Sequence, residues 1–306
     1  MRRLEHIITV QEAGWRTDAV LRQTLRLSGT VIKRVKHLPE GILLDGRQVW
    51  PSFPVSPGQT LSVLVGDTEN GNAAPREGEL DIVYEDEDLV ILNKPAGLPT
   101  HPGPTEVYQT VGNFLMYRYN AMGLPHVFRP VNRLDAHTSG LMVAARHAHA
   151  HSLLKEQLHT PDFRRCYLAV CDGVPQPLQG VVDAPIGEDE TSYLKRKITP
   201  EGAPSRTRYR VVEQAGGRAL VALELETGRT HQIRLHMAHL GCPLCGDFLY
   251  GREDKELIGR TALHSAYLEL IQPITGEKLR FAAPLPEDMA RLFPVAPLPD
   301  SWYDTL

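Results

Sequence analysis

Apolar residues in the first part of the chain recur first with helical and then with strand-like spacing. Across residues 18–36 they return every three or four positions, and the Ser28-Gly29 pair interrupts the series. This pattern predicts a pair of short helices. Residues 41–50 place Asp45-Gly46 between two apolar stretches, which is typical of a β-hairpin, and a further strand is expected at residues 61–65.

The segment that follows lacks periodic apolar positions. Residues 66–79 are rich in Gly, Asn, Ala and acidic side chains, a composition typical of a solvated linker. We therefore expect a small α/β module at residues 1–66, a linker at 67–79 and a larger domain at 80–306. The length of 306 residues agrees with about two domains.

Strand-like and helical patterns mix in the larger domain without strict alternation. We therefore expect an α+β fold with a mixed sheet rather than a doubly wound parallel sheet. A helix is expected at residues 231–240, with Thr230 as its N-cap and Gly241 at its C-terminal end. Strands are expected within residues 80–95, 166–173 and 219–226, and helices at 147–158 and 231–240.

The composition is that of an ordinary folded protein, with 42% hydrophobic and 23% charged residues. No apolar run reaches the roughly eighteen residues of a membrane span. Glu5 and His6 lie where a signal peptide would be apolar, so we expect a cytoplasmic protein without membrane association. Four cysteines are too few for a disulfide scaffold and are expected to be free thiols.

The net charge of −4 is unevenly distributed along the chain. Residues 1–66 hold nine Lys or Arg against five Asp or Glu, a balance of +4, which leaves −8 for the remainder. Screening at physiological salt confines the field of a charge to about 8 Å, so a local basic patch can attract phosphates even in an acidic protein. The first module is therefore the expected docking surface for a phosphate-bearing partner.

Three segments of the larger domain contain the candidate chemistry. They are RPVNRLDAHTSGLMVAAR at residues 129–146, RRCYLAVCDG at 164–173 and LETGRTHQIRLHMAHLGCPLCGD at 225–247. In order and spacing they resemble the motifs of the RluA-type pseudouridine synthases, which modify large-subunit ribosomal RNA and some transfer RNAs. Residues 83–103 and 263–286 are similar to framework segments of the same family.

The resemblance extends over most of residues 80–295. It implies a pseudouridine synthase catalytic domain with a mixed, largely antiparallel central sheet and an active-site cleft, and it implies no cofactor. In the first module, LSGTVIKRV and GILLDGRQVW are similar to the alpha-L type of RNA-binding module that many of these enzymes carry.

The resemblance also implies the residues of the site. Asp135 matches the essential carboxylate, which either attacks the flipped uridine or stabilises the cleaved sugar; outside such a motif, a loop aspartate more often caps backbone groups. Arg133 matches the side chain that fills the space left by the extruded base, and Tyr167 the ring that stacks on the target base. The simpler alternatives are a paired surface arginine and a tyrosine packed in the core. Arg234 matches a cation that would keep the carboxylate charged, and Ile233 an aliphatic wall of the uracil pocket.

Three positions depart from the commonest family pattern. Asn132 and Cys242 each stand where the family often has a His, and Arg165 stands where it often has a Lys. None of them touches the predicted chemical step. They leave the subfamily, and therefore the substrate, open.

Two clusters could suggest a metal site, but we expect none. The cysteines lack the regular spacing of a zinc ribbon and fall partly in a family segment that needs no metal. The histidines lack a nearby carboxylate, so a solvated helix start is expected there. The clusters are Cys166, Cys171, Cys242 and Cys245, and His147, His149 and His151.

The sequence thus predicts a monomeric enzyme that isomerises specific uridines in structured RNA to pseudouridine. Large-subunit ribosomal RNA is favoured over transfer RNA because of the family members that carry the same N-terminal module. One alternative is a non-catalytic RNA-binding or ribosome-assembly protein on the same fold, which would need no buried carboxylate. Another is a nucleoside hydrolase that uses Asp135 on small molecules, which would need no basic module.

Overall fold

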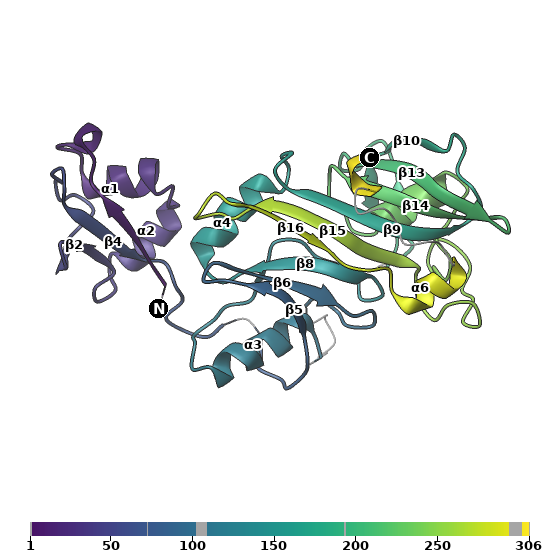
Figure 1. The fold of residues 1–306 in the computed structure, drawn as a ribbon, viewed down its shortest axis with the longest axis horizontal. Helices are drawn as coiled ribbons and strands as arrows, with labels where there is room; N and C mark the ends of the chain where they lie inside the picture. The colour runs from purple at the N-terminus through teal and green to yellow at the C-terminus, as the bar shows by residue number, and fades with distance from the viewer. Residues whose placement is uncertain (1, 72, 102–108, 193, 294–301, 306) are drawn as a thin grey trace.

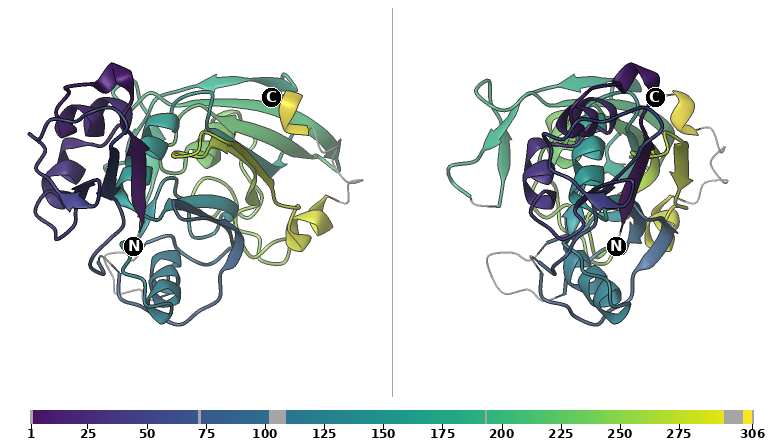
Figure 2. Two further views of the ribbon diagram at one scale, coloured as in Figure 1. Left: turned by 60° about the vertical axis from the view of Figure 1, so that its left-hand side comes forward. Right: turned by 90° about the vertical axis from the view of Figure 1, so that its left-hand side faces the viewer.

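The chain folds around two main β-sheets, a small one at one end of an elongated molecule and a large one through the rest (Figures 1 and 2). The computed structural model describes residues 2–71, 73–101, 109–192, 194–293 and 302–305. The end of the first framework segment, at residues 102–103, and most of the C-terminal stretch of the predicted catalytic domain, at 294–301 and 306, lie outside the described residues.

The N-terminal module, residues 2–66, contains a four-stranded antiparallel sheet with the order β1-β4-β2-β3. The predicted helix pair and hairpin are confirmed, and Asp45 and Gly46 have the positive φ angles of a two-residue hairpin turn, 48° and 76°. Strand β1 was not predicted, because its five residues RLEHI include only two apolar side chains. The elements are β1 (Arg3–Ile7), η1 (Val10–Glu12), α1 (Thr17–Ala19), η2 (Val20–Thr24), α2 (Gly29–Val35), β2 (Ile42–Leu44), β3 (Arg47–Gln48) and β4 (Thr60–Leu64).

The larger sheet has ten strands in the order β10-β13-β14-β9-β15-β8-β6-β5, with β16 beside β15 and β7 beside β8. All these pairings are antiparallel except that of β8 with β15, so the predicted mixed, largely antiparallel α+β fold is confirmed. Its strands are β5 (Asp81–Glu85), β6 (Leu89–Lys94), β7 (Arg129–Pro130), β8 (Ser139–Ala145), β9 (Arg164–Asp172), β10 (Gln179–Asp183), β13 (Arg206–Ala215), β14 (Arg218–Leu225), β15 (Leu263–Ile271) and β16 (Lys278–Ala282). The remaining elements are the ribbon β11 (Ile186–Glu188) and β12 (Arg196–Ile198) and the helices α3 (Val111–Ala121), α4 (Ala148–Gln157), α5 (Gln232–His239), α6 (Glu287–Leu292) and η3 (Trp302–Thr305).

Strand β6 is buried on both of its faces. Ile91 belongs to the same hydrophobic cluster as Leu154 of α4, and Leu92 to the cluster that contains Leu115 of α3. Successive strand residues point to opposite faces, so α3 and α4 cover opposite faces of the sheet. Burial of each such side chain stabilises the fold by about 1.5–3 kcal/mol.

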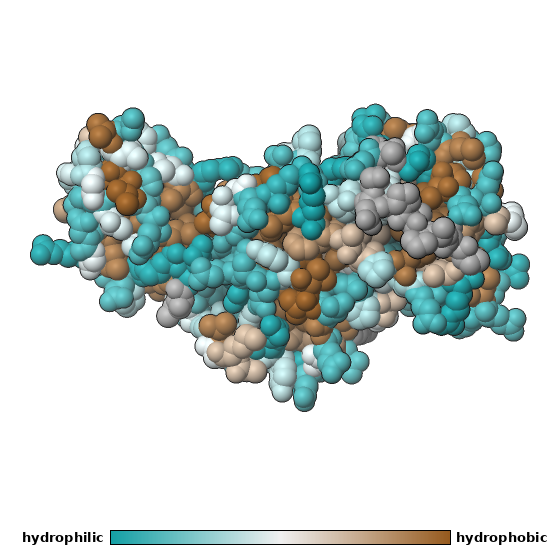
Figure 3. Space-filling model, in the orientation of Figure 1, coloured by the Kyte–Doolittle hydropathy of each residue, from teal (hydrophilic) through white to brown (hydrophobic). Residues whose placement is uncertain are grey.

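Helix length and surface hydropathy can be compared with what a membrane span requires. Among the described residues, no helix is both long enough and apolar enough to cross a membrane. On the face drawn in Figure 3, hydrophobic patches are separated by hydrophilic surface. The large apolar side chains that are exposed include Val10, Trp50 and Phe53 of the module.

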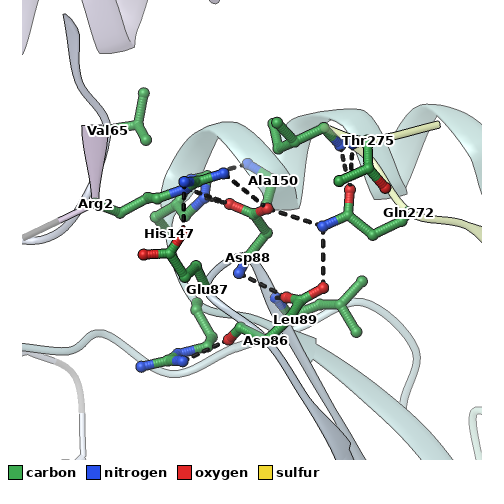
Figure 4. A network of polar contacts seen from close by, with 12 residues as sticks. Arg2, Val65, Asp86, Glu87, Asp88, Leu89, His147, Ala150, Gln272 and Thr275 are labelled. Carbon is green, nitrogen blue, oxygen red and sulfur yellow. Dashed lines mark hydrogen bonds and ion pairs between the residues drawn. The ribbon is translucent and has the colours of Figure 1, made fainter. Parts of the chain in front are cut away.

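A partly buried ion pair joins the module to the large sheet. Arg2, next to β1, donates to Asp88 from Nε (2.9 Å) and Nη2 (3.2 Å), as Figure 4 shows. Asp88 also accepts from Gln272 Nε2 (2.8 Å) and His147 Nε2 (2.9 Å). His147 Nδ1 accepts the N–H of Ala150, so a neutral ring carries its proton on Nε2. The expected solvated helix start is therefore wrong: His147 is buried, and a carboxylate 59 residues away in sequence lies beside it.

A second junction changes the expectation for the linker. Asp67, its first residue, is buried rather than solvated and accepts from Arg129 at 2.6 and 2.8 Å and from Arg34 of the module at 3.4 Å. Arg26 of the module pairs with Glu156 of α4 at 2.6 Å. Part of the basic excess of the module is thus opposed by acidic residues that follow it in sequence. The division of the chain into two domains at this linker stays a prediction.

Candidate active site

Asp135 lies in the loop between β7 and β8, and neighbouring side chains hold the backbone of this loop. Thr100 Oγ1 donates to the carbonyl of Leu134 (2.9 Å), and Lys94 Nζ donates to the carbonyl of Ala136 (3.1 Å). The backbone on both sides of Asp135 is therefore fixed, while its side chain remains 30% exposed. A substrate can approach this carboxylate without displacing the loop.

Lys94 is a buried cation beneath the loop. Its side chain is among the largest fully buried ones, and Nζ also donates to the carbonyls of Pro95 and Leu98, both at 2.8 Å. Burial lowers the pKa of Lys94 to about 7, although the charge of Asp135 opposes this shift. Three carbonyl acceptors match the three N–H groups of an ammonium ion, so the hydrogen bonds favour the charged form that burial disfavours.

Arg234 of α5 reaches Asp135 despite a separation of 99 residues in sequence, as predicted. Its Nη1 lies 3.4 Å from Oδ2 of Asp135. Its stronger partner, Asp247, was not predicted: the Asp247 carboxylate accepts from Nε and Nη2 of Arg234 at 2.7 Å each. Burial lowers the pKa of Arg234, but the hydrogen bond and charge of Asp247, followed by those of Asp135, raise it overall above its usual range.

His231 is the second group that approaches Asp135. Its Nε2 lies 3.8 Å from Oδ2 of Asp135, and its Nδ1 lies 3.0 Å from the hydroxyl of Tyr250. Burial lowers the pKa of His231, although Asp135 acts in the opposite direction. His231 also precedes α5 as its N-cap with a φ of 59°, so the prediction of Thr230 as the cap is wrong, whereas Gly241 does follow the helix with a φ of 74°.

All five predicted site residues line one small cavity beside a larger cleft. The small cavity has a volume of about 50 Å³ and the cleft one of about 720 Å³. Arg133, Asp135 and Tyr167 line both. The five predicted residues among those that line the small cavity are Arg133, Asp135, Tyr167, Ile233 and Arg234.

The walls of these cavities differ in exposure and polarity. Tyr167 of β9 and Ile233 of α5 are only 4% and 3% exposed and belong to the main hydrophobic cluster, so they form fixed walls. Arg133 is exposed at the rim. Asn132, one of the departures from the family pattern, is buried and accepts the N–H of Val143 in β8 at 2.9 Å. The roles of the predicted residues stay predictions.

The larger cleft is lined by an excess of cationic side chains, although one of them, Arg129, is already paired with Asp67. Among its described lining residues, Asp135 is the one carboxylate, against five Arg or Lys. This concentration of cations contrasts with the net charge of −4 of the chain. The cationic residues are Arg129, Arg133, Lys155, Arg165 and Arg229.

The cysteine and histidine clusters carry no metal-binding geometry within the described ranges. No group of three or more His, Cys, Asp or Glu side chains is arranged there to hold an ion. The four cysteines are buried free thiols, and burial raises the pKa of Cys171 well above its usual range. That the protein needs no metal stays a prediction.

Sequence reasoning did not assign Lys94, His231 or Asp247 to the site. All three lie inside the segments that support the family resemblance. The available signal was a polar side chain within an otherwise apolar run, such as the aspartate in CPLCGDFLY at residues 242–250. Their partners lie far away in sequence or across a turn, so spacing alone could not identify them.

Known proteins are similar to this chain over most of its length. A model of the RNA pseudouridylate synthase family matches residues 88–239. The chain is 37% identical to an uncharacterised RNA pseudouridine synthase, YhcT, of Bacillus subtilis over 95% of this chain and 96% of that protein. It is 40% identical to ribosomal large subunit pseudouridine synthase D of Xanthomonas campestris over 94% and 90% of the two chains. The solved structure of human RNA pseudouridylate synthase domain containing 1 is similar with a TM-score of 0.58 and 26% identity, covering 74% of this chain and 93% of that one.

Proposed function

Because this chain belongs to the RNA pseudouridylate synthase family and is an RNA pseudouridine synthase, we propose that it isomerises uridine in large-subunit ribosomal RNA with Asp135 as the catalytic carboxylate. The observation that carries the proposal is the position of Asp135, 3.4 Å from a buried arginine, at a cleft lined by five other cations. A cationic cleft in an acidic protein favours a polyanion as the substrate.

The proposed reaction conserves all atoms of the nucleotide. The bond from C1′ of the ribose to N1 of uracil breaks, and a bond from C1′ to C5 forms. C5 loses a proton and N1 gains one, so no co-reactant is needed. Asp135 either attacks the ribosyl group or stabilises its positive charge while the base rotates, and Arg234 holds a positive charge 3.4 Å from this carboxylate.

The target base must leave its stack to reach Asp135. In this proposal, Arg133 at the rim fills the vacated space and offsets part of the unstacking cost, about a few kcal/mol. Tyr167 provides a planar wall for the uracil ring, and Ile233 an aliphatic one. Their burial supports the assignment, because a preformed pocket loses little entropy when the base enters.

Ribosomal RNA is preferred over transfer RNA on the basis of the similar proteins. Several of them bear the name ribosomal large subunit pseudouridine synthase D and align over most of both chains. Transfer RNA is the alternative substrate. Pseudouridine mapping of total RNA from a deletion strain and its parent decides between them: a site lost from large-subunit RNA supports the proposal, and a site lost only from transfer RNA contradicts it.

The N-terminal module is proposed to contact RNA through a subset of its basic residues. Arg2, Arg26 and Arg34 pair with acidic residues outside the module and contribute little to an external field. Arg16, Lys33 and Arg47 are exposed, and no ion pair involving them occurs among the described side chains. Lys33 and Arg47 are therefore among the proposed phosphate contacts.

A further inference from the structure

Arg234 is shared between two carboxylates in an unequal way. Its guanidinium presents the Nε and Nη2 edge to Asp247 in a bidentate pair with both distances at 2.7 Å. Only Nη1 faces Asp135, at the longer distance of 3.4 Å. Bidentate pairs are both stronger and more directional than single contacts. The orientation of the guanidinium is therefore set by Asp247.

Asp247 is itself held rigidly. Its side chain is fully buried, and Oδ1 accepts the N–H groups of Leu249 (2.9 Å) and Tyr250 (3.2 Å). The preceding Gly246 has a φ of 69°, and a Cβ there would lie 2.2 Å from the carbonyl oxygen of Arg260. The turn that presents Asp247 thus admits only glycine at this position without rearrangement.

Two aromatic rings from the same turn restrict the guanidinium further. The centroids of Phe248 and Tyr250 lie 5.7 and 5.4 Å from Cζ of Arg234. These contacts are within the range of cation–π attraction. Asp247 therefore binds one edge of the Arg234 guanidinium, and the rings of Phe248 and Tyr250 contact it. One nitrogen remains available to Asp135.

We propose that Asp247 is a positioning residue of the reaction: by occupying the bidentate edge of Arg234, it keeps that cation near Asp135 without letting it cover the reactive carboxylate oxygens. Without Asp247, the free edge of Arg234 turns to Asp135 and forms the bidentate pair there. Both oxygens of Asp135 are then occupied, and the carboxylate is withheld from the ribose. This inference rests on the proposed function of Asp135.

The first test compares the kcat and KM of Asp247→Asn with those of Asp88→Asn over a range of RNA concentrations that reaches saturation. Asp88 is a matched control, because it is also a buried aspartate that accepts twice from one arginine, but it lies at the module junction. Asp247→Asn is expected to lower kcat by about 100-fold with KM changed by less than about threefold, whereas Asp88→Asn keeps kcat. Asp247→Glu, which restores the charge, is expected to recover about tenfold of the loss. Equal kcat values for Asp247→Asn and Asp88→Asn would overturn the inference.

A second comparison covers the case in which Asp247→Asn does not fold. The double variant Arg234→Met/Asp247→Leu removes both buried charges, a change that proteins commonly tolerate. If Asp247 acts only through Arg234, the kcat of the double variant equals that of Arg234→Met alone. A kcat more than about threefold lower in the double variant would overturn the inference. A wild-type protein that makes no pseudouridine would instead refute the proposed function, so the two failures are distinguishable.

Discussion

Replacing Asp88 with Asn should weaken the junction between the N-terminal module and the large sheet and lower the free energy of unfolding. The side chain is 3% exposed and accepts from Arg2, Gln272 and His147 (Figure 4). The substitution removes the charge but keeps the shape. It leaves the guanidinium of Arg2 and the Nε2–H of His147 facing an amide that can satisfy only part of them.

The magnitude follows from the pKa of Asp88. Burial alone would raise this pKa, but hydrogen bonds from His147, Arg2 and Gln272 lower it from the ordinary 3.8 to about 2. Each pH unit corresponds to about 1.4 kcal/mol, so the charged carboxylate contributes about 2 kcal/mol to the free energy of unfolding. Because the folded pKa is depressed, this contribution is fully present above pH 4 and is lost as the pH falls towards 2.

The assay is urea unfolding of the wild type and Asp88→Asn at pH 7 and at steps down to pH 2.5. We expect a loss of about 2 kcal/mol at pH 7 and a shrinking difference below pH 4. Glu87→Gln is the control, because Glu87 pairs with the same Arg2 but is 71% exposed, and it should cost less than about 1 kcal/mol. Equal stability of Asp88→Asn and wild type at pH 7, or a difference independent of pH, would refute the reasoning.

Three further predictions concern the site and its partners. Arg234→Met should lower kcat by about 100-fold or more, since the fixed cation beside Asp135 is gone; a single-turnover assay with less than about tenfold loss would contradict this. Lys33→Ala/Arg47→Ala should weaken RNA binding and reduce the slope of log K against log salt by about 1–2, with kcat retained; filter binding across a salt series checks it, and an unchanged slope counts against these contacts. Exhaustive chelation should leave full activity, and an activity that returned only with zinc would reopen the cysteine cluster.

The parts of the fold that could be predicted are those specified by local pattern. The Asp45-Gly46 hairpin needs only two residues that tolerate positive φ, and α5 is specified by its apolar spacing and by Gly241. Strand β1 could not be predicted, because its pairing with β4 supplies what its own RLEHI sequence lacks. A helix, strand or turn can be predicted where the residues that stabilise it are also its neighbours in sequence.

The site was likewise predictable only in part. The motif strings brought Asp135 and Arg234 together correctly, although neither pattern nor spacing could indicate that Asp247 holds the arginine more tightly. His147, which precedes α4, was wrongly expected in solvent. Its carboxylate partner Asp88 lies 59 residues earlier in the sequence, directly before β6. Buried polar pairs are formed by the tertiary fold, so the residues that complete a site escape a reading of single segments.

The proposed reaction depends most on Asp135 as the catalytic carboxylate. Its most direct test incubates purified wild type and Asp135→Asn with deproteinised ribosomal RNA and maps pseudouridine by carbodiimide modification and reverse transcription. We expect pseudouridine at a discrete uridine of the large-subunit RNA with the wild type, and none with Asp135→Asn, even though this variant still binds the RNA. Measurable pseudouridine formed by purified Asp135→Asn would contradict the catalytic role of Asp135.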